Sequence, residues 1–210
     1  MAIALFDFDG TLTTKDSMRL FFALVDPGRV GWWRFLRVAP GVVLSHGFER
    51  EALKKALVHA FLAGKTQEEL AVLGRQFVQT VLPAHLNQTV LARMRRYRDE
   101  GAQVAIVSAS LDVWLRPFAE QEGVELLCTE AAYTHGQFMG EWQTPNCNGV
   151  EKRRRVELYF PDWAQHHITV YGNSAGDAAL LNMADEAWWV DGNGVCTRWG
   201  QDVFGHRNHL

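Results

Sequence analysis

Two carboxylates separated by a single residue, Asp7 and Asp9, follow an apolar run that begins at residue 2. The run predicts a buried strand, and an ionised Asp7 at its end would be costly to bury without a ligand. Two acids beside a metal ion and a phosphate could divide nucleophilic attack and proton transfer between them. The alternative is an ordinary strand-to-turn junction, where an Asp-Gly pair is common. Because the acids, Gly10 and Thr11 occur together, we favour the catalytic interpretation.

Three later segments carry further polar side chains next to predicted strands and helices: Val104–Ser110, Asn146–Lys152 and Tyr171–Asp177. Together with Asp7–Thr13 they resemble, in sequence and in order, the four motifs of the haloacid dehalogenase-like hydrolases. Within that superfamily the chain is similar to the branch of phosphoserine phosphatases and the bacterial phosphatidylglycerophosphatase C type. The first motif is specific, whereas the second and third are weak alone. The ordered set spans most of the chain.

The resemblance implies a role for each of four side chains. Asp7 would attack phosphorus, form an aspartyl-phosphate intermediate and bind the metal. Asp9 would protonate the leaving alcohol and then deprotonate the hydrolytic water, a double task that favours a raised pKa. Ser108 would donate a hydrogen bond to the phosphate, and Lys152 would neutralise the oxygens that gain charge.

The same resemblance implies a Mg²⁺ ion held by Asp7, Asp9 (through its backbone carbonyl), Asn173 and Asp177. Hard oxygen ligands suit Mg²⁺, which would screen the repulsion between a carboxylate and a phosphate ester. The family usually has aspartate where this chain has Asn173, and an amide oxygen ligates the ion without bringing a charge. Weaker metal binding is therefore expected, with Asp177 compensating directly or through a water molecule.

Four residues are predicted substrate contacts: Gly10, Ala109, Asp16 and Arg50. Gly10 would allow close approach of the backbone and offer its amide to the phosphate. Asp16 and Arg50 are candidate contacts for a polar head group, although Asp16 fits the N-cap of a helix equally well.

Structural alternatives exist for two of the catalytic side chains. Ser108 could be a strand-end hydroxyl bonded to local backbone. Lys152 starts a run of four basic residues, 152–155, that could be a solvated helix face. Gly149, three residues earlier, favours Lys152 as the cation of the site.

The elements that must position these side chains alternate along the chain. Strands are expected at 2–8, 103–107, 124–129, 167–171 and 187–191, and helices at 86–100, 111–122, 149–160 and 175–183. This alternation predicts an α/β fold, a Rossmann-like three-layer core with a parallel sheet covered on both faces. Ligands bind beyond the carboxyl ends of such strands, where the motifs lie. Residues 132–142 predict a β-hairpin.

Residues 16–83 form a helical block between the first strand and the next strand unit, so we expect an insertion. The resemblance identifies it as a helical cap over the active site, which leaves 1–15 and 84–210 as the core. Helices are expected at 18–25, 50–62 and 66–82, the last opened by a capping box at Thr66–Glu69. The apolar segment 32–44 is interrupted by Pro40 and Gly41. The pattern assigns no role to the glycine-rich segment 192–210.

The predicted cap is rich in aromatic side chains with arginines between them: Phe21, Phe22, Trp32, Trp33, Phe35, Leu36, Arg29, Arg34, Arg37 and Arg50. One interpretation is a surface for a lipid phosphate, with peripheral membrane contact, because Trp and Arg favour the membrane interface. The other, which we favour, is that cap helices pack on one another and on the core.

Bulk properties fit one compact domain or a core with a modest insertion. The chain has 210 residues, 48% hydrophobic, and a net charge of −3, so nothing favours nucleic-acid binding. Its three cysteines are too few and scattered for a disulfide framework or a zinc site and fit a cytoplasmic protein. No signal peptide and no transmembrane segment are expected.

The sequence therefore predicts a Mg²⁺-dependent phosphomonoester hydrolase that acts on a phosphorylated small molecule or lipid head group. Dehalogenation is disfavoured, because that reaction has no use for Asp9. A catalytically weakened, phosphate-binding relative with a binding or regulatory role is the alternative, and Asn173 keeps it open.

Overall fold

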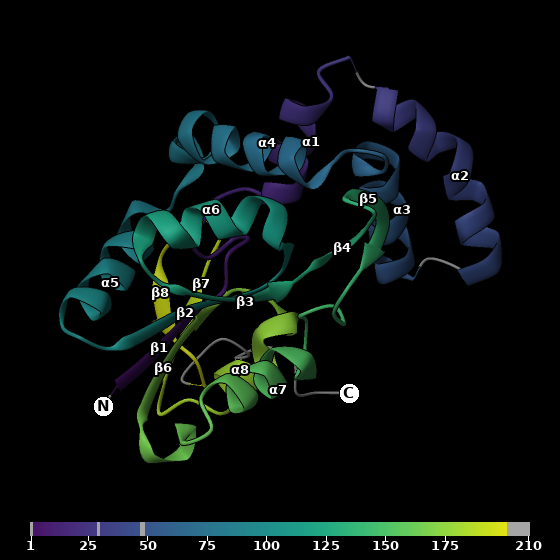
Figure 1. Cartoon of the computed structure of the whole chain (residues 1–210). Coiled ribbons are helices and arrows are strands. Elements are labelled where there is room, and N and C mark those ends of the chain that lie inside the picture. The colour runs from purple at the N-terminus through teal and green to yellow at the C-terminus, as the bar shows by residue number, and fades with distance from the viewer. Residues whose placement is uncertain (1, 29, 47–48, 201–210) are drawn as a thin grey trace.

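A six-stranded sheet forms the centre of the computed structural model, which describes residues 2–28, 30–46 and 49–200 (Figure 1). The strand order is β3-β2-β1-β6-β7-β8. Five strands are parallel, and β8 is antiparallel to β7 at one edge. The strands are β1 (Ala2–Phe6), β2 (Gln103–Leu111), β3 (Glu125–Thr129), β6 (His167–Gly172), β7 (Glu186–Val190) and β8 (Cys196–Arg198).

Helices cover both faces of the sheet. On one face lie α5 (Gln88–Asp99) and α6 (Asp112–Glu122), and on the other α7 (Val150–Tyr159) and α8 (Ala178–Leu181) (Figure 1). Successive residues of β1 point to opposite faces. Accordingly, Ala4 and Phe6 pack in the core under α5 and α6, whereas Ile3 and Leu5 pack under α7 and α8. This explains the continuous apolar run of β1 and confirms the expected α/β, Rossmann-like fold.

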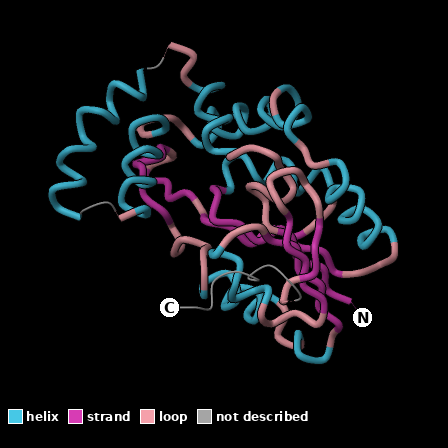
Figure 2. The backbone as a smooth tube through the Cα atoms, turned by 180° about the vertical axis from the view of Figure 1, so that it is seen from behind, coloured by secondary structure: helices cyan, strands magenta, loops and turns pink. Residues whose placement is uncertain are grey.

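Four helices follow β1 before the chain returns to the sheet in β2: α1 (Ser17–Val25), α2 (Val30–His46), α3 (Arg50–Leu62) and α4 (Gln67–Thr80). Seen from behind, they lie to one side of the strands (Figure 2). The predicted capping box is present, since Thr66 and Glu69 each bond the other's backbone amide. A 3₁₀ turn, Leu82–His85, containing Pro83, then leads to α5.

Helix α2 differs from the sequence prediction, which interrupted the apolar segment at Pro40 and Gly41. The structure has one helix over Val30–His46 that contains Pro40. A proline removes one backbone hydrogen bond from a helix. Pro40 is exposed, so water can reach the carbonyl group that is left free.

Helices α4 and α6 approach each other closely at Gly74. A Cβ atom added to Gly74 would lie 2.1 Å from the carbonyl oxygen of Val113. In a regular helix this carbonyl would accept from residue 117, which is proline here and has no N–H group. Glycine at this crossing therefore lets α4 lie on the turn of α6 that Pro117 leaves without its bond, and the insertion is joined firmly to the core.

The predicted hairpin is present as β4 (Ala131–Thr134) and β5 (Gln137–Trp142), and it is separate from the main sheet. Its backbone bonds to the segment between α3 and α4. The amide of Gly64 donates to Phe138 O, and the amide of Phe138 donates to Lys65 O, both at 2.9 Å. The hairpin therefore lies with the inserted helices.

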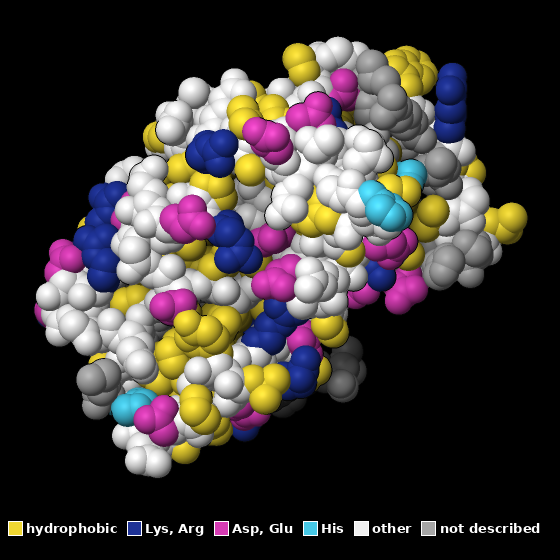
Figure 3. Space-filling model, in the orientation of Figure 1, with side chains coloured by type: hydrophobic (Ala, Val, Ile, Leu, Met, Phe, Trp, Pro, Cys, Tyr) yellow, Lys and Arg dark blue, Asp and Glu magenta, His cyan; other side chains and the backbone are white. Residues whose placement is uncertain are grey.

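Part of the glycine-rich C-terminal segment has a structural role that the sequence did not indicate, because residues 196–198 form edge strand β8. Residues 201–210 lie outside the described part of the chain. No helix within the described residues is both long and apolar enough to span a membrane. On the face shown in Figure 3, Lys and Arg side chains lie among Asp and Glu side chains and do not gather in one patch.

Candidate active site

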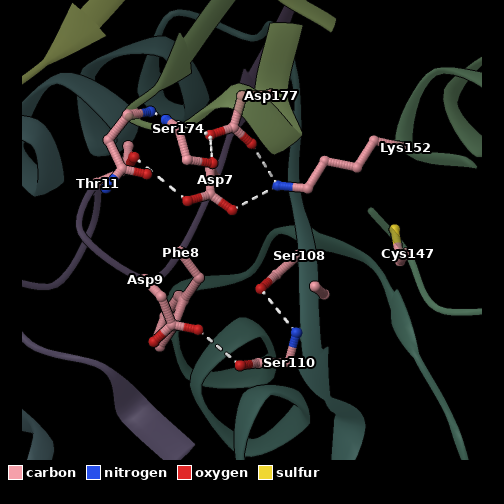
Figure 4. A network of polar contacts seen from close by, with 12 residues as sticks. Asp7, Phe8, Asp9, Thr11, Ser108, Ser110, Cys147, Lys152, Ser174 and Asp177 are labelled. Atoms are coloured by element: carbon pink, nitrogen blue, oxygen red, sulfur yellow. Dashed lines mark hydrogen bonds and ion pairs between the residues drawn. The ribbon is translucent and has the colours of Figure 1, made fainter. Parts of the chain in front are cut away.

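Asp7 is the first residue after β1, and its backbone amide continues the pairing with β6 by donating to Tyr171 O at 2.9 Å. The residue is 7% exposed. One carboxylate oxygen, Oδ1, lies 2.5 Å from Lys152 Nζ, and the other accepts from Thr11 Oγ1 at 3.4 Å (Figure 4). The strand therefore delivers a buried carboxylate to the carboxyl edge of the sheet.

Lys152 is the cation of this cluster. Its Nζ also donates to Asp177 Oδ1 at 2.6 Å, and the residue is 2% exposed (Figure 4). Its neighbours in the basic run, Arg153 and Arg154, instead form exposed ion pairs with acidic residues of their own helix. The structure thus identifies which of the four basic residues faces Asp7.

The loop after β6 brings Asn173 and Asp177 to the same place. Asp177 Oδ2 accepts from the amides of Asn173 and Ser174 and from Ser174 Oγ, at 3.1, 2.9 and 2.8 Å. Both oxygens of Asp177 are therefore occupied by protein donors. Asn173 Oδ1, by contrast, is buried and has no hydrogen-bond partner.

Gly10 is required for this arrangement. Its φ is +82°, a region that favours glycine. A Cβ atom added here would lie 1.9 Å from Nδ2 of Asn173. The Asn173 side chain therefore rests directly on the backbone of the first motif, and two segments far apart in sequence meet.

Asp9 is held by one hydrogen bond to each carboxylate oxygen. The Ser17 amide, at the start of α1, donates to Oδ1, and the Ser110 hydroxyl of β2 donates to Oδ2, both at 2.6 Å (Figure 4). Sequence reasoning missed both serines. A signal existed for Ser110, because Ser108 and Ser110 are two apart in a strand and share a face.

Ser108 is 1% exposed, and its hydroxyl oxygen accepts from the Ser110 amide at 3.1 Å. The Ser108 hydrogen is thus available for another acceptor. The carbonyl oxygen of Ala109 accepts from Thr129 Oγ1 at 2.8 Å and from Lys54 Nζ at 2.6 Å.

Lys54 is a site residue that the sequence did not single out. It lies in α3, and its ammonium reaches the second motif at Ala109 and also donates to Asn146 Oδ1 at 3.3 Å. Its ammonium also lies over the Trp142 ring of the hairpin, 5.0 Å from the ring centroid. No carboxylate of the described residues lies within ion-pair distance of Lys54. Nothing in the helical pattern of residues 50–62 distinguished this lysine from Lys55.

The other two predicted substrate contacts lie outside this network. Asp16 is exposed and caps α1, accepting from the Arg19 amide at 2.9 Å. Arg50 is exposed at the start of α3, one turn before Lys54. A role for either in substrate binding stays a prediction.

Burial dominates the electrostatics of the cluster. It raises the pKa of Asp7 to about 7, although the Lys152 ammonium acts in the opposite direction. It also raises the pKa of Asp9, against the hydrogen bonds from Ser110 and Ser17. Burial lowers the pKa of Lys54. Burial alone would lower the pKa of Lys152, but two carboxylates raise it above its usual value.

The donor set fits a hard cation. Within the described residues, no three His, Cys, Asp or Glu side chains form a metal-binding group. The oxygens around the first motif are instead of mixed type, the Asp7 carboxylate and the Asn173 amide, with the Asp9 carbonyl expected as a third. A buried amide oxygen without a donor is a suitable ligand for Mg²⁺.

Comparison with known proteins agrees with the fold and with the motifs. The haloacid dehalogenase-like hydrolase family model matches residues 4–182. The chain therefore belongs to this family of hydrolases, as the four motifs predicted.

Individual relatives share the arrangement over most of their length. The chain is 35% identical over 192 residues to protein CicA of Caulobacter vibrioides, which covers 86% of this chain and 82% of that protein. A Bordetella pertussis Tohama I protein of unknown function has a TM-score of 0.72 at 23% identity, covering 89% of this chain and 88% of that one. A phospho-aspartyl intermediate analogue of phosphoserine phosphatase has a TM-score of 0.58 at 14% identity, with 89% and 84% covered. The two structural likenesses support the same fold.

Proposed function

We propose that this protein is a Mg²⁺-dependent phosphomonoester hydrolase that acts through an aspartyl-phosphate intermediate. The observation that carries the proposal is the position of Asp7, a buried carboxylate 2.5 Å from the Lys152 ammonium and on the same loop as Asp9. Family membership and the likeness to phosphoserine phosphatase structures support it.

Each side chain has a defined task. An oxygen of Asp7 attacks phosphorus, and the bond from phosphorus to the leaving oxygen breaks as Asp9 gives that oxygen a proton. A water then attacks the phosphorus of the aspartyl phosphate, Asp9 takes the proton, and Asp7 and inorganic phosphate are released. Ser108 donates to a phosphate oxygen, and Lys152 stabilises the charge that develops.

Mg²⁺, when bound, would screen the charge between carboxylate and phosphate and align them. Asp7, Asn173 and the Asp9 carbonyl would hold it. Because both oxygens of Asp177 already accept from protein donors, we assign Asp177 to fixing Lys152 and the loop after β6. This assigns the direct contact to Asn173.

We also propose that the inserted helices act as a cap, with the hairpin β4–β5 as part of it. Lys54 brings a cation from this cap to Ala109, and among the described residues its oxygen partners are neutral. Such a buried ammonium favours a leaving group that carries its own negative charge. The cap therefore selects phosphate esters with a second anionic group.

A lipid-linked substrate is a more specific form of the proposal. Helix α2 contains no acidic residue, and Trp33, Leu36 and Leu44 are 67%, 57% and 91% exposed. Exposed Trp and aliphatic side chains on a helix with arginines suit a membrane surface. A panel of phosphorylated metabolites together with phosphatidylglycerophosphate would separate a small substrate from a lipid-linked one.

The deciding experiment measures turnover of p-nitrophenyl phosphate with Mg²⁺ and with a chelator, for the wild type and for Asp7→Asn. We expect turnover only with metal, and none for Asp7→Asn, whose unfolding transition remains cooperative. Phosphate binding without any turnover by the wild type would instead support the weakened, phosphate-binding alternative. Near-normal turnover by Asp7→Asn would remove the nucleophile assignment.

A further inference from the structure

Ser110 lies between two side chains of the proposed mechanism. Its hydroxyl donates to Asp9 Oδ2 at 2.6 Å, and its backbone amide donates to Ser108 Oγ at 3.1 Å (Figure 4). Ser110 itself is 4% exposed and has the geometry of a fixed donor. One residue therefore contacts both the phosphate-binding hydroxyl and the proposed acid.

The backbone of β2 explains how one residue reaches both. Residues two apart in a strand point to the same side, so Ser108 and Ser110 both face the first motif. The pairing of β2 with β3 shifts register between Ser108 and Leu111, which marks an irregularity at this point. Such irregularities turn side chains away from regular sheet positions.

The second oxygen of Asp9 is held by the insertion. Ser17 is the first residue of α1, and its amide donates to Asp9 Oδ1 at 2.6 Å. The first amides of a helix have no partner within the helix and attract a carboxylate. Trp114 Nε1 of α6 donates to Ser17 Oγ at 2.9 Å and anchors this turn to the core. Asp9 is thus oriented jointly by core and insertion.

We propose that Ser110 and the amide of Ser17 are the positioning groups of the proton donor Asp9. They hold its carboxyl group towards the leaving oxygen, and Ser110 also turns the Ser108 hydrogen towards the phosphate. The inference rests on the proposed phosphatase reaction and adds two residues to it. Its consequence is selective: substrates whose leaving group needs a proton depend on these contacts, and substrates whose leaving group does not need one depend on them little.

The test compares kcat/KM for an alkyl phosphate, glycerol phosphate, with kcat/KM for p-nitrophenyl phosphate. This parameter covers the steps up to departure of the alcohol, so hydrolysis of the intermediate does not enter. For Ser110→Ala we expect about a 10- to 100-fold loss with the alkyl ester and less than about threefold with the aryl ester, because only the alkyl oxygen needs the acid. Ser110→Thr keeps the hydroxyl and should restore the wild-type ratio.

A pair of variants isolates the Ser17 amide. Proline is well tolerated at the first position of a helix, and Asp16 has the extended backbone that precedes a proline (φ −64°, ψ 114°). Ser17→Pro removes the N–H donor, whereas Ser17→Ala removes only the hydroxyl. We expect Ser17→Pro to change the alkyl-to-aryl ratio as Ser110→Ala does, and Ser17→Ala to keep it within about threefold of the wild type.

Thr80→Ala, which removes an exposed hydroxyl from the end of α4, serves as the control for hydroxyl loss. If Ser110→Ala does not fold, Ser110→Cys replaces it, since it keeps the volume and donates only weakly. An equal loss on both substrates, or no loss on either, would overturn the positioning role while leaving the phosphatase proposal intact. If the wild type turns over neither ester with Mg²⁺, the phosphatase proposal itself fails.

Discussion

Lys152→Met removes the cation that two buried carboxylates share. In the wild type, Lys152 Nζ lies 2.5 Å from Asp7 and 2.6 Å from Asp177. Methionine has a similar length and no charge, so the change leaves little empty volume. Asp177 keeps the three donors on its other oxygen, whereas Asp7 keeps only the contact from Thr11 at 3.4 Å. The cost of the change therefore falls on Asp7.

Breaking a buried ion pair from one side costs about 3–5 kcal/mol, because the remaining charge is left without compensation. We expect a loss of this size at pH 8, a large share of the roughly 5–15 kcal/mol that keeps a domain folded. The sign with pH follows from the pKa of Asp7, which burial already raises to about 7. Without Lys152 the folded protein holds this proton still more tightly than the unfolded chain does. The loss should therefore be smaller at pH 5, where Asp7 is neutral.

The assay is equilibrium unfolding in urea, followed by tryptophan fluorescence at pH 5 and pH 8. Arg153→Met is the matched control, because Arg153 is the next residue of the helix and pairs only with exposed Glu157 in the described structure. Its loss should stay below about 1 kcal/mol, and its phosphatase activity should equal that of the wild type. If the two variants were destabilised equally at pH 8, the reasoning from a shared buried cation would be refuted.

Three further predictions concern the metal and the cap. Mg²⁺ must displace a proton from Asp7, so calorimetry should show about tenfold weaker binding at pH 6 than at pH 8. Gly10→Ala should abolish Mg²⁺ binding in the same assay, because the new Cβ would lie 1.9 Å from Asn173 Nδ2; unchanged affinity would contradict the role of Asn173. Lys54→Gln should raise KM about tenfold for an ester with a second anionic group and leave p-nitrophenyl phosphate nearly unaffected, whereas Lys55→Gln should change neither. Equal effects on both substrates would remove Lys54 from leaving-group selection.

The sequence was sufficient for the core because the apolar strands carried the signal. The strands that precede Asp7, Ser108 and Asn173 are buried on both faces, and continuous apolar runs mark such strands. Their parallel order brings their carboxyl ends together, so the meeting of the motifs could be predicted. Even the choice of cation was indicated, since Gly149 starts α7 three residues before Lys152.

The remaining site residues left weaker signals. Lys54 reaches the site through the packing of α3 on the core, and a helical pattern does not specify which of two adjacent lysines turns inwards. The Ser17 contact uses a backbone amide, which every residue except proline has. Edge strand β8 is three residues long, too short for an alternation pattern. The continuity of α2 depends on the exposure of Pro40, which is a tertiary property.

The charge balance of the site bears on the departure at position 173. Asp7 and Asp177 contribute two negative charges and Lys152 one positive charge, so the cluster carries a net charge of −1 when both acids are ionised. An aspartate at 173 would make this −2 in the same buried space. Because Asn173 supplies an oxygen without a charge, the metal-free cluster carries less repulsion, and the ion is attracted less strongly when it is alone. The two negative charges of a phosphate ester then supply attraction that the protein lacks. The asparagine therefore favours binding of metal and substrate together over a metal held permanently in the empty site.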